Sequence, residues 1–212
     1  MASASTTREF VPDNLLHAAA AACNALAPAR DADWSVLARD LEWTCHRTLQ
    51  HMAEAPLFHA THLATRATAR RPSLRAGETP PPVADLLQLI PADAAILADV
   101  ARAAPPDARG WHATGMADAS GFAAISCVEL LIHTDDIAQA LGIPYRPPDD
   151  LARRIVGRLC PWAPAGHDGW ATLQWAAGRA ALPDHPRLGA DWAWQSAPLS
   201  EWDGTVKKRR PA

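Results

Sequence analysis

Hydrophobic side chains recur at steps of three and four residues along most of this chain, which is the period of an α-helix buried along one face. Shorter polar stretches, many of them rich in proline and glycine, separate the periodic segments. The pattern therefore predicts a mainly helical, all-α fold, with helices over residues 13–27, 41–70, 83–104, 121–142, 149–160 and 168–181.

Several of these helices carry residues that predict where they begin, bend or end. Asp13 or Asn14 can cap the first helix and Asp40 the second, because short polar side chains accept hydrogen bonds from the free N–H groups of a first turn. Pro56 is expected to kink the second helix. Gly142 is suited to end the fourth helix, because glycine adopts the left-handed conformation of a C-cap.

The segments between and after the long helices give weaker predictions. Pro91 is expected to split the third helix, and residues 71–82 and 105–120 are predicted to be loops. Trp192 and Trp194 alternate with smaller residues, which is consistent with a short strand. The chain after residue 161 holds six of the nine tryptophans, and this aromatic segment either covers the helices or also walls a pocket.

Length, charge and hydropathy narrow the class of protein. A chain of 212 residues with 49% hydrophobic residues forms one domain, or one domain with a small appendage. The net charge of −3 gives no indication of a nucleic-acid or membrane partner. No apolar run approaches the roughly 18 residues of a membrane helix, and the first ten residues lack the apolar core of a signal peptide. A cytoplasmic protein that acts on a small molecule is expected, with a homodimer left open. The final basic residues, 207–212, are predicted to be disordered.

The four cysteines show no spacing typical of a zinc ribbon or a Cys-x-x-Cys motif. Cys23, Cys45, Cys127 and Cys160 are therefore predicted to be reduced and mostly buried. Cys45 is the candidate for a catalytic thiol, but nothing near it in the sequence would lower its pKa.

The most informative segment is the helix predicted over residues 121–142. Glu129, His133 and Asp136 lie at steps of four and three, so they share one face of this helix with apolar side chains. A carboxylate among apolar neighbours is costly unless something positive meets it. The choice is between a cationic side-chain partner and a bound metal.

Spacing alone does not decide between these alternatives. Asp13 and His17, and also Glu42 and His46, show the same spacing of an acid four residues before a histidine. Those two pairs lie at polar helix starts, whereas the pair in the fourth helix has apolar neighbours on both sides.

A third candidate ligand lies on the second predicted helix. His51 has small or apolar neighbours on the face through Leu41, Thr48 and Ala55, where it is either a hydrogen-bonded core histidine or a metal ligand. If the second and fourth helices face each other, His51 would join Glu129 and His133. Two imidazoles and one carboxylate leave positions open for water or substrate.

Parts of the chain resemble the DinB/YfiT-like superfamily, and most closely its actinobacterial branch, typified by mycothiol-dependent maleylpyruvate isomerase. The segments that carry the resemblance are DLEWTCHRTLQHMA (40–53), GFAAISCVELLIHTDDIAQALGIPYRPP (121–148), GRAAL (178–182) and EWDG (201–204). The resemblance implies a DinB-like four-helix bundle over residues 10–160 that binds a metal. It further implies a short, aromatic-rich C-terminal extension over 161–212 that packs on the bundle.

The branch has a Trp-Thr pair seven residues before a histidine on its second helix, and a Glu-Leu-x-x-His-x-x-Asp pattern on its fourth. The matching residues here are Trp43, Thr44, His51, Glu129, Leu130, His133 and Asp136. The resemblance thus implies that His51, Glu129 and His133 bind a divalent metal. Zinc is usual in this branch, and nickel, cobalt, iron or manganese are alternatives.

Two departures from the branch bear on the reaction. Asp135 stands where the branch often has an aromatic residue, so a more polar pocket floor is expected. The full isomerases carry a larger C-terminal domain that helps to form the substrate site, whereas only residues 162–212 follow Pro161 here.

The leading functional hypothesis is a metal-dependent enzyme that activates a low-molecular-weight thiol, mycothiol first, for S-transfer or isomerisation of a small electrophile. Asp136 is the candidate for orienting a ligand histidine or a bound water, with an ion pair to a nearby arginine as the alternative. Arg179 is the candidate for holding a substrate carboxylate. His112, in the loop before the fourth helix, is a further candidate proton donor.

Two other hypotheses stay open. In the first, metal-bound water replaces the thiol and the protein is a hydrolase or lyase. In the second, the protein is a non-catalytic helical module with a structural or vestigial metal.

Overall fold

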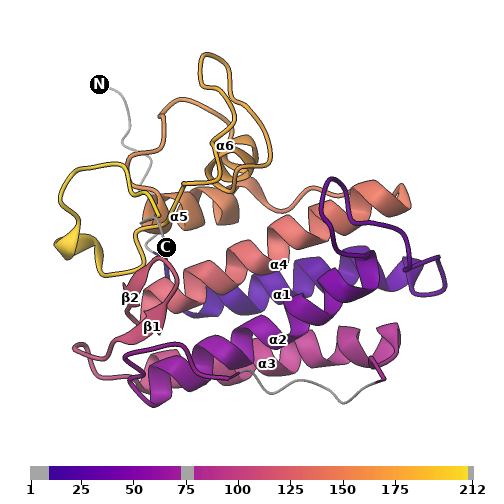
Figure 1. Cartoon of the computed structure of the whole chain (residues 1–212), viewed down its shortest axis with the longest axis horizontal. Coiled ribbons are helices and arrows are strands. Elements are labelled where there is room, and N and C mark those ends of the chain that lie inside the picture. Colours follow the sequence, from indigo (N-terminus) through magenta and orange to yellow (C-terminus); the bar gives the residue numbers. More distant parts are fainter. Residues whose placement is uncertain (1–9, 73–78, 210–212) are drawn as a thin grey trace.

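A computed structural model of the chain describes residues 10–72 and 79–209, and within these ranges the protein is mainly helical (Figure 1). Its elements in chain order are α1 (Asp13–Leu26), η1 (Ala27–Ala29), α2 (Cys45–Ala64), α3 (Val83–Ala103), β1 (Gly110–His112), β2 (Gly115–Ala117), α4 (Ala119–Leu141), α5 (Asp149–Leu159), α6 (Gly169–Ala176) and η2 (Leu199–Glu201). No helix in the described ranges is both long enough and apolar enough to cross a membrane.

The four long helices pack on one another, and α4 is central to them. Helix α4 contacts α1, α2 and α3, and also α5 on its other side (Figure 1). Most of its side chains are buried all round the helix, including Phe122, Ile125 and Leu130. This burial explains why the 121–142 segment is apolar beyond a single stripe. Asp118 is the N-cap of α4, and Gly142 is its C-cap, with the left-handed φ of 68° that was predicted for this position.

The capping residues predicted for the first two helices are wrong, although α1 begins at Asp13 as predicted. Neither Asp13 nor Asn14 is the N-cap of α1, because the Asn14 side chain instead accepts a hydrogen bond from the Val11 N–H group at 3.0 Å. Helix α2 begins at Cys45, and Thr44 caps it in place of Asp40.

Local backbone pairing explains the late start of α2. The Ala38 N–H group donates to the Trp43 carbonyl, and the Cys45 N–H group donates to the Val36 carbonyl. These bonds fold residues 38–43 into a turn, so the helical periodicity there does not become a helix.

The predicted break in α3 is also wrong. Pro91 lies inside α3, which is continuous from Val83 to Ala103. A proline has no N–H group for the carbonyl four residues earlier, here that of Leu87. The Cys23 thiol of α1 donates to this carbonyl at 3.4 Å, so a neighbouring helix satisfies the group that proline leaves free. Pro56 likewise lies inside α2.

The segment predicted as a loop before α4 contains a β-hairpin. Strands β1 and β2 pair antiparallel, with His112 opposite Gly115. Trp192 pairs with Lys208 in an isolated antiparallel bridge. The short strand predicted around Trp192 and Trp194 is therefore reduced to this single bridge. Two residues predicted to belong to a disordered tail flank this bridge with backbone hydrogen bonds: the Lys207 carbonyl accepts from the Ala193 N–H group, and the Arg209 N–H group donates to the Asp191 carbonyl. Residues 210–212 lie outside the described ranges.

Residues 191–197, here called the C-terminal strap, cross the beginning of α4. Arg158 of α5 holds the strap by donating to the Gln195 carbonyl at 2.9 Å and to the Ser196 carbonyl at 3.3 Å. The same guanidinium is paired with Asp118, the N-cap of α4. A buried arginine with several acceptors thus fixes the strap to the helix end.

Gly121 is where the strap and α4 come closest, and its replacement by alanine tests this contact. A Cβ atom at Gly121 would collide with the Ser196 carbonyl oxygen and with the Arg158 guanidinium. We expect Gly121→Ala to lower the free energy of unfolding by about 1–3 kcal/mol, as overpacking does elsewhere. The matched control is Gly157→Ala in α5, where a Cβ meets no atom within 4 Å. The control should be neutral or stabilising. Equal behaviour of the two variants in urea unfolding would contradict the packing described here.

Candidate metal centre

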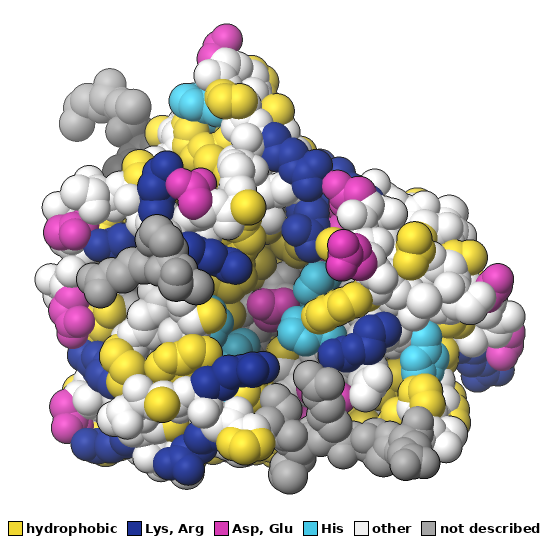
Figure 2. Space-filling model, in the orientation of Figure 1, with side chains coloured by type: hydrophobic (Ala, Val, Ile, Leu, Met, Phe, Trp, Pro, Cys, Tyr) yellow, Lys and Arg dark blue, Asp and Glu magenta, His cyan; other side chains and the backbone are white. Residues whose placement is uncertain are grey.

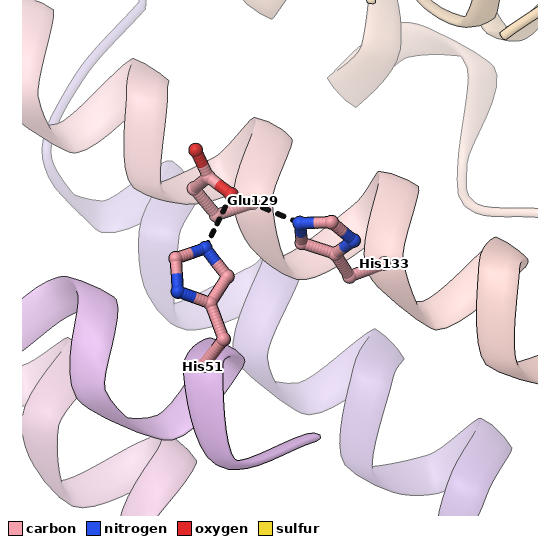
Figure 3. A group of neighbouring side chains, drawn as sticks. All are labelled: His51, Glu129 and His133. Atoms are coloured by element: carbon pink, nitrogen blue, oxygen red, sulfur yellow. Dashed lines mark hydrogen bonds and ion pairs between the residues drawn. The ribbon is translucent and has the colours of Figure 1, made fainter. Parts of the chain in front are cut away.

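The two helices predicted to carry metal ligands bring three side chains together. His51 extends from α2, and Glu129 and His133 extend from neighbouring turns of α4 (Figure 3). The Nε2 atoms of His51 and His133 lie 3.1 Å and 3.2 Å from the same oxygen, Oε2 of Glu129. One ligand atom from each residue lies within 4.8 Å of the other two, so the group could hold a metal ion.

The spacing of the donors suits a small divalent cation. Ligand atoms placed tetrahedrally at about 2.0–2.2 Å from a cation lie about 3.3–3.6 Å from one another. The two nitrogen–oxygen distances, 3.1 Å and 3.2 Å, are close to this range. The set of two imidazoles and one carboxylate is typical of zinc and other first-row divalent metals. The residues present therefore fit a divalent metal.

Each ligand side chain is only partly exposed, with 29% of His51, 19% of Glu129 and 12% of His133 accessible to solvent. Burial by itself would raise the pKa of Glu129, but hydrogen bonds and charges from His133 and His51 outweigh it and hold that pKa well below its usual range. No lysine or arginine of the described residues forms an ion pair with Glu129. Its carboxylate is therefore ionised and faces two imidazole nitrogens. Burial alone would lower the pKa of His133, but hydrogen bonds and charges from Asp136 and Glu129 raise it to about 9, so a metal would bind by displacing a proton from this ring.

Asp136 lies behind His133, at the place predicted for a residue that orients a ligand. Its Oδ2 atom is 3.0 Å from His133 Nδ1, and its side chain is fully buried. Burial alone would raise the pKa of Asp136, but hydrogen bonds from His133 and Arg179 keep it lowered. Because Nδ1 of His133 contacts this carboxylate, Nε2 is the nitrogen left to face Glu129 and the cavity.

Arg179, the predicted anchor for a substrate carboxylate, has a partner within the protein. Its Nε and Nη2 atoms both donate to Asp136, each at 2.9 Å at closest approach. The guanidinium is thus already used in the bidentate contact that a substrate carboxylate would need. Both roles considered for Asp136, a histidine partner and an arginine partner, occur together.

Asp135 does not make the pocket floor more polar, because its side chain points away from the metal group. Its Oδ2 atom accepts hydrogen bonds from Gln139 at 2.7 Å, from Gln174 at 3.0 Å and from Arg39 at 3.3 Å. Asp135 and Asp136 are consecutive on a helix, so they lie on different faces, and only Asp136 reaches His133.

The three candidate ligands lie in a cavity of about 460 Å³. Figure 2 shows a hollow in this face of the molecule, with histidine and acidic side chains visible between basic ones. Besides the ligands, its walls include Trp43 before α2, His112 of β1, Arg179 after α6, and Trp192 and Trp194 of the strap. The aromatic C-terminal segment therefore lines this cavity, which answers the question that the pattern of tryptophans left open.

The cysteines take no part in this centre. None of the four forms a disulfide, and only Cys23 is partly exposed. Burial raises the pKa of Cys45 to about 11, so its thiol stays protonated at neutral pH. A catalytic thiol at Cys45 is not supported.

Sequence patterns did not indicate a second group of histidines next to the metal group. His59 of α2 is buried, and its Nδ1 atom lies 2.7 Å from Ser126 Oγ of α4. Its ring centroid is 5.6 Å from that of His112. Burial lowers the pKa of His59 to about 3, with a further lowering by the neighbouring His112. His59 is therefore neutral in the folded protein at all ordinary pH values.

The buried His59 is expected to make the protein sensitive to acid. Its pKa is about 3 when folded and about 6.5 when unfolded, so the unfolded chain binds more protons and stability falls as the pH drops below 6.5. Between about pH 6 and about pH 4.5, protonation of this residue in the unfolded chain should lower the free energy of unfolding by about 1.4 kcal/mol per pH unit. Glu129, His51, His62 and His112 are the other titratable groups that act on it.

The corresponding experiment is urea unfolding at several pH values with the double variant His59→Leu/Ser126→Ala. The variant removes the titrating ring and the hydroxyl that would otherwise lose its partner, so its stability should fall less steeply with acid. Exposed His17 provides the control variant His17→Leu. Parallel stability curves for the wild type and the double variant would show that His59 is not the group responsible.

Comparison of the chain with known protein families, with curated proteins and with solved structures finds no match.

Proposed function

We propose that this protein is a metal-dependent enzyme that activates a low-molecular-weight thiol for attack on a small electrophile, by S-transfer or isomerisation. The observation that carries the proposal is the convergence of His51, Glu129 and His133 at a cavity of about 460 Å³. This volume lies within the range of about 300–1,000 Å³ that small-molecule sites occupy.

The proposal includes a fold assignment. Residues 10–160 would form a DinB-like four-helix bundle built on α1–α4, and residues 161–212 a C-terminal extension packed on it. The support is the packing of α4 against α1, α2 and α3, together with the residues that resemble the DinB/YfiT-like superfamily. The strap residues Trp192 and Trp194 would then serve in place of the larger C-terminal domain of the full isomerases.

A divalent metal, zinc first, would be held by His51, Glu129 and His133, and when bound it would lower the pKa of a thiol in contact with it, as metals do for coordinated water and thiols. Two protein nitrogens and one carboxylate leave room for a further ligand from the cavity. Mycothiol is the thiol that the resemblance favours.

The chain's own side chains would position the reactants. Asp136 and Arg179 fix the ring of His133, which is a positioning role for both. Arg209 borders the cavity and forms no ion pair among residues 10–72 and 79–209, and its guanidinium stacks over Trp192 at 5.2 Å. We therefore assign to Arg209, rather than to Arg179, the binding of an anionic substituent on either reactant.

Thiol dependence of turnover tests this proposal. Zinc-loaded protein is incubated with benzyl chloride and either mycothiol or 2-mercaptoethanol, and loss of free thiol is followed. Turnover is expected only when both zinc and a thiol are present, and His51→Ala should abolish it while His17→Ala keeps it. Turnover of hydrolysable esters by zinc-loaded protein without any thiol would instead favour the hydrolase alternative. Zinc binding with no turnover of either kind would favour a non-catalytic module.

A further inference from the structure

His112 borders the same cavity as the metal group but is not one of its ligands. Its position before the fourth predicted helix indicated a loop residue and a candidate proton donor. The structure places it at the end of β1, with its ring stacked on Trp194 of the strap at a centroid distance of 6.1 Å and an interplanar angle of 22°. Phe122 of α4 meets the ring edge-on at 6.4 Å. Aromatic contacts on two sides therefore fix the ring relative to the cavity.

The hydrogen bonds of His112 determine which ring nitrogen carries the proton. The backbone N–H group of Thr114 donates to Nδ1 at 3.2 Å, and Thr114 Oγ1 lies 2.8 Å from the same nitrogen. A backbone N–H group can only donate, so Nδ1 carries the lone pair. The proton of the neutral ring is then on Nε2. Among the residues that the structure describes, Nε2 has no protein hydrogen-bond partner.

The ring is neutral at ordinary pH. Burial lowers the pKa of His112 to about 4, and the negative charge of Glu129 opposes this only in part. A cation at the metal group would lower this pKa further, because it offsets the charge of Glu129. A neutral imidazole is a poor proton donor but a good hydrogen-bond donor. This favours a role as hydrogen-bond donor over the role as proton donor expected from the sequence.

We propose that Nε2–H of His112 holds the carbonyl oxygen of the substrate and stabilises the negative charge that forms on this oxygen during reaction. A fixed, neutral imidazole N–H group is suited to polarising a carbonyl without protonating it. The substrate class is then a carbonyl compound. An α,β-unsaturated ketone is a suitable probe, because addition of a thiol to it places negative charge on the carbonyl oxygen. The reaction rests on the proposed function, whereas the assignment of the donor does not.

In the step that His112 would assist, a thiol adds to the carbon–carbon double bond of the carbonyl compound. The thiol gives up its proton to solvent, and the sulfur electron pair forms a carbon–sulfur bond at the β-carbon. The π electrons of the double bond shift toward the carbonyl, whose oxygen gains negative charge and accepts the hydrogen bond from Nε2 of His112. The α-carbon then takes a proton from water, which restores the carbonyl. No oxidant or further reactant is needed.

The first test is a nuclear magnetic resonance experiment on protein labelled with ¹⁵N-histidine, which needs no turnover. At neutral pH we expect His112 to carry its proton on Nε2 only. In zinc-loaded protein without thiol, cyclohex-2-enone should shift the Nε2–H signal in a saturable way, and cyclohexene, which has the same ring but no oxygen, should not. Protonation on Nδ1, an equal response to both compounds or no response to either would overturn the proposal.

The second test compares rates with 2-mercaptoethanol for two electrophiles, cyclohex-2-enone and benzyl chloride. Only the enone places charge on a carbonyl oxygen, so the ratio of the two rates isolates the oxygen-binding role. His112→Phe is expected to lower the ratio about 100-fold, as loss of one such donor does in other enzymes. His112→Gln keeps an N–H group and should retain the ratio within about tenfold.

Exposed His17→Phe is the control and should leave the ratio unchanged. An unchanged ratio in His112→Phe would overturn the proposal. If the protein activates no thiol with either electrophile, the proposed function fails, and the resonance experiment alone decides the role of His112.

Discussion

Alanine at position 129 is expected to leave the purified protein without bound metal. Glu129 is the only carboxylate in the candidate ligand set, and its Oε2 atom contacts both histidine nitrogens. Removing it leaves two imidazoles and no negative charge to offset the cation. Zinc affinity should fall by well over 100-fold, because loss of an outer hydrogen-bond partner alone costs about 10–100-fold. Isothermal titration with zinc, together with elemental analysis of the dialysed protein, measures this directly.

Glu42 provides a closely matched control for Glu129. It borders the same cavity and also precedes a histidine by four residues, yet it does not belong to the candidate ligand group. Glu42→Ala should therefore bind one zinc ion like the wild type, and His51→Ala should lose it like Glu129→Ala. Stoichiometric zinc in Glu129→Ala, or its loss in Glu42→Ala, would contradict the assignment.

Asp136→Ala is expected to have the largest effect on stability. The carboxylate is fully buried and paired with both Arg179 and His133. Its removal leaves the largely buried Arg179 guanidinium without its partner, which costs about 3–5 kcal/mol in comparable buried pairs. The ring of His133 also loses the contact that orients it, so zinc affinity should fall by about 10–100-fold. Urea unfolding and zinc titration measure the two effects separately.

The double variant Asp136→Leu/Arg179→Met separates the two roles of Asp136. It replaces both buried charges by apolar side chains, so most of the lost stability should return. Zinc affinity should stay low, because nothing then orients His133. A loss of less than about 1 kcal/mol in Asp136→Ala would show that the buried pair matters little here. A double variant no more stable than the single one would show the same.

Sequence pattern was most reliable where the relevant contacts are local. The spacing of Glu129 and His133 follows from one turn of helix, and Gly142 ends α4 because its own backbone conformation requires glycine. These features depend on a few consecutive residues. Mainly helical structure was predictable for the same reason, since the hydrophobic period is a local property.

The contacts of His51 could not be predicted from the hydrophobic pattern alone. Its neighbours on α2 allowed either a core histidine or a ligand, because its distance to Glu129, 78 residues later in the sequence, depends on how α2 and α4 pack. The resemblance to a known fold provided the grouping that spacing could not. The structure then placed His51 beside Glu129.

Contacts distant in sequence account for what the pattern did not indicate. The Arg179 guanidinium was assigned to a substrate because nothing near it in the sequence shows that Asp136, 43 residues earlier, takes its donors. Helix α3 was expected to break at Pro91, because nothing near Pro91 in the sequence shows that the Leu87 carbonyl has another donor. That donor is the Cys23 thiol of α1. His112 looked like a loop residue because its two-strand hairpin is too short to give a periodic signal.

The most direct measurement is the position of anomalous scattering in crystals of the protein loaded with one equivalent of zinc. One peak is expected at about 2.0–2.2 Å from Nε2 of His51, Nε2 of His133 and a carboxylate oxygen of Glu129. A peak bound by other side chains, or no peak at this group in crystals that contain stoichiometric zinc, would contradict the metal centre and the function proposed from it.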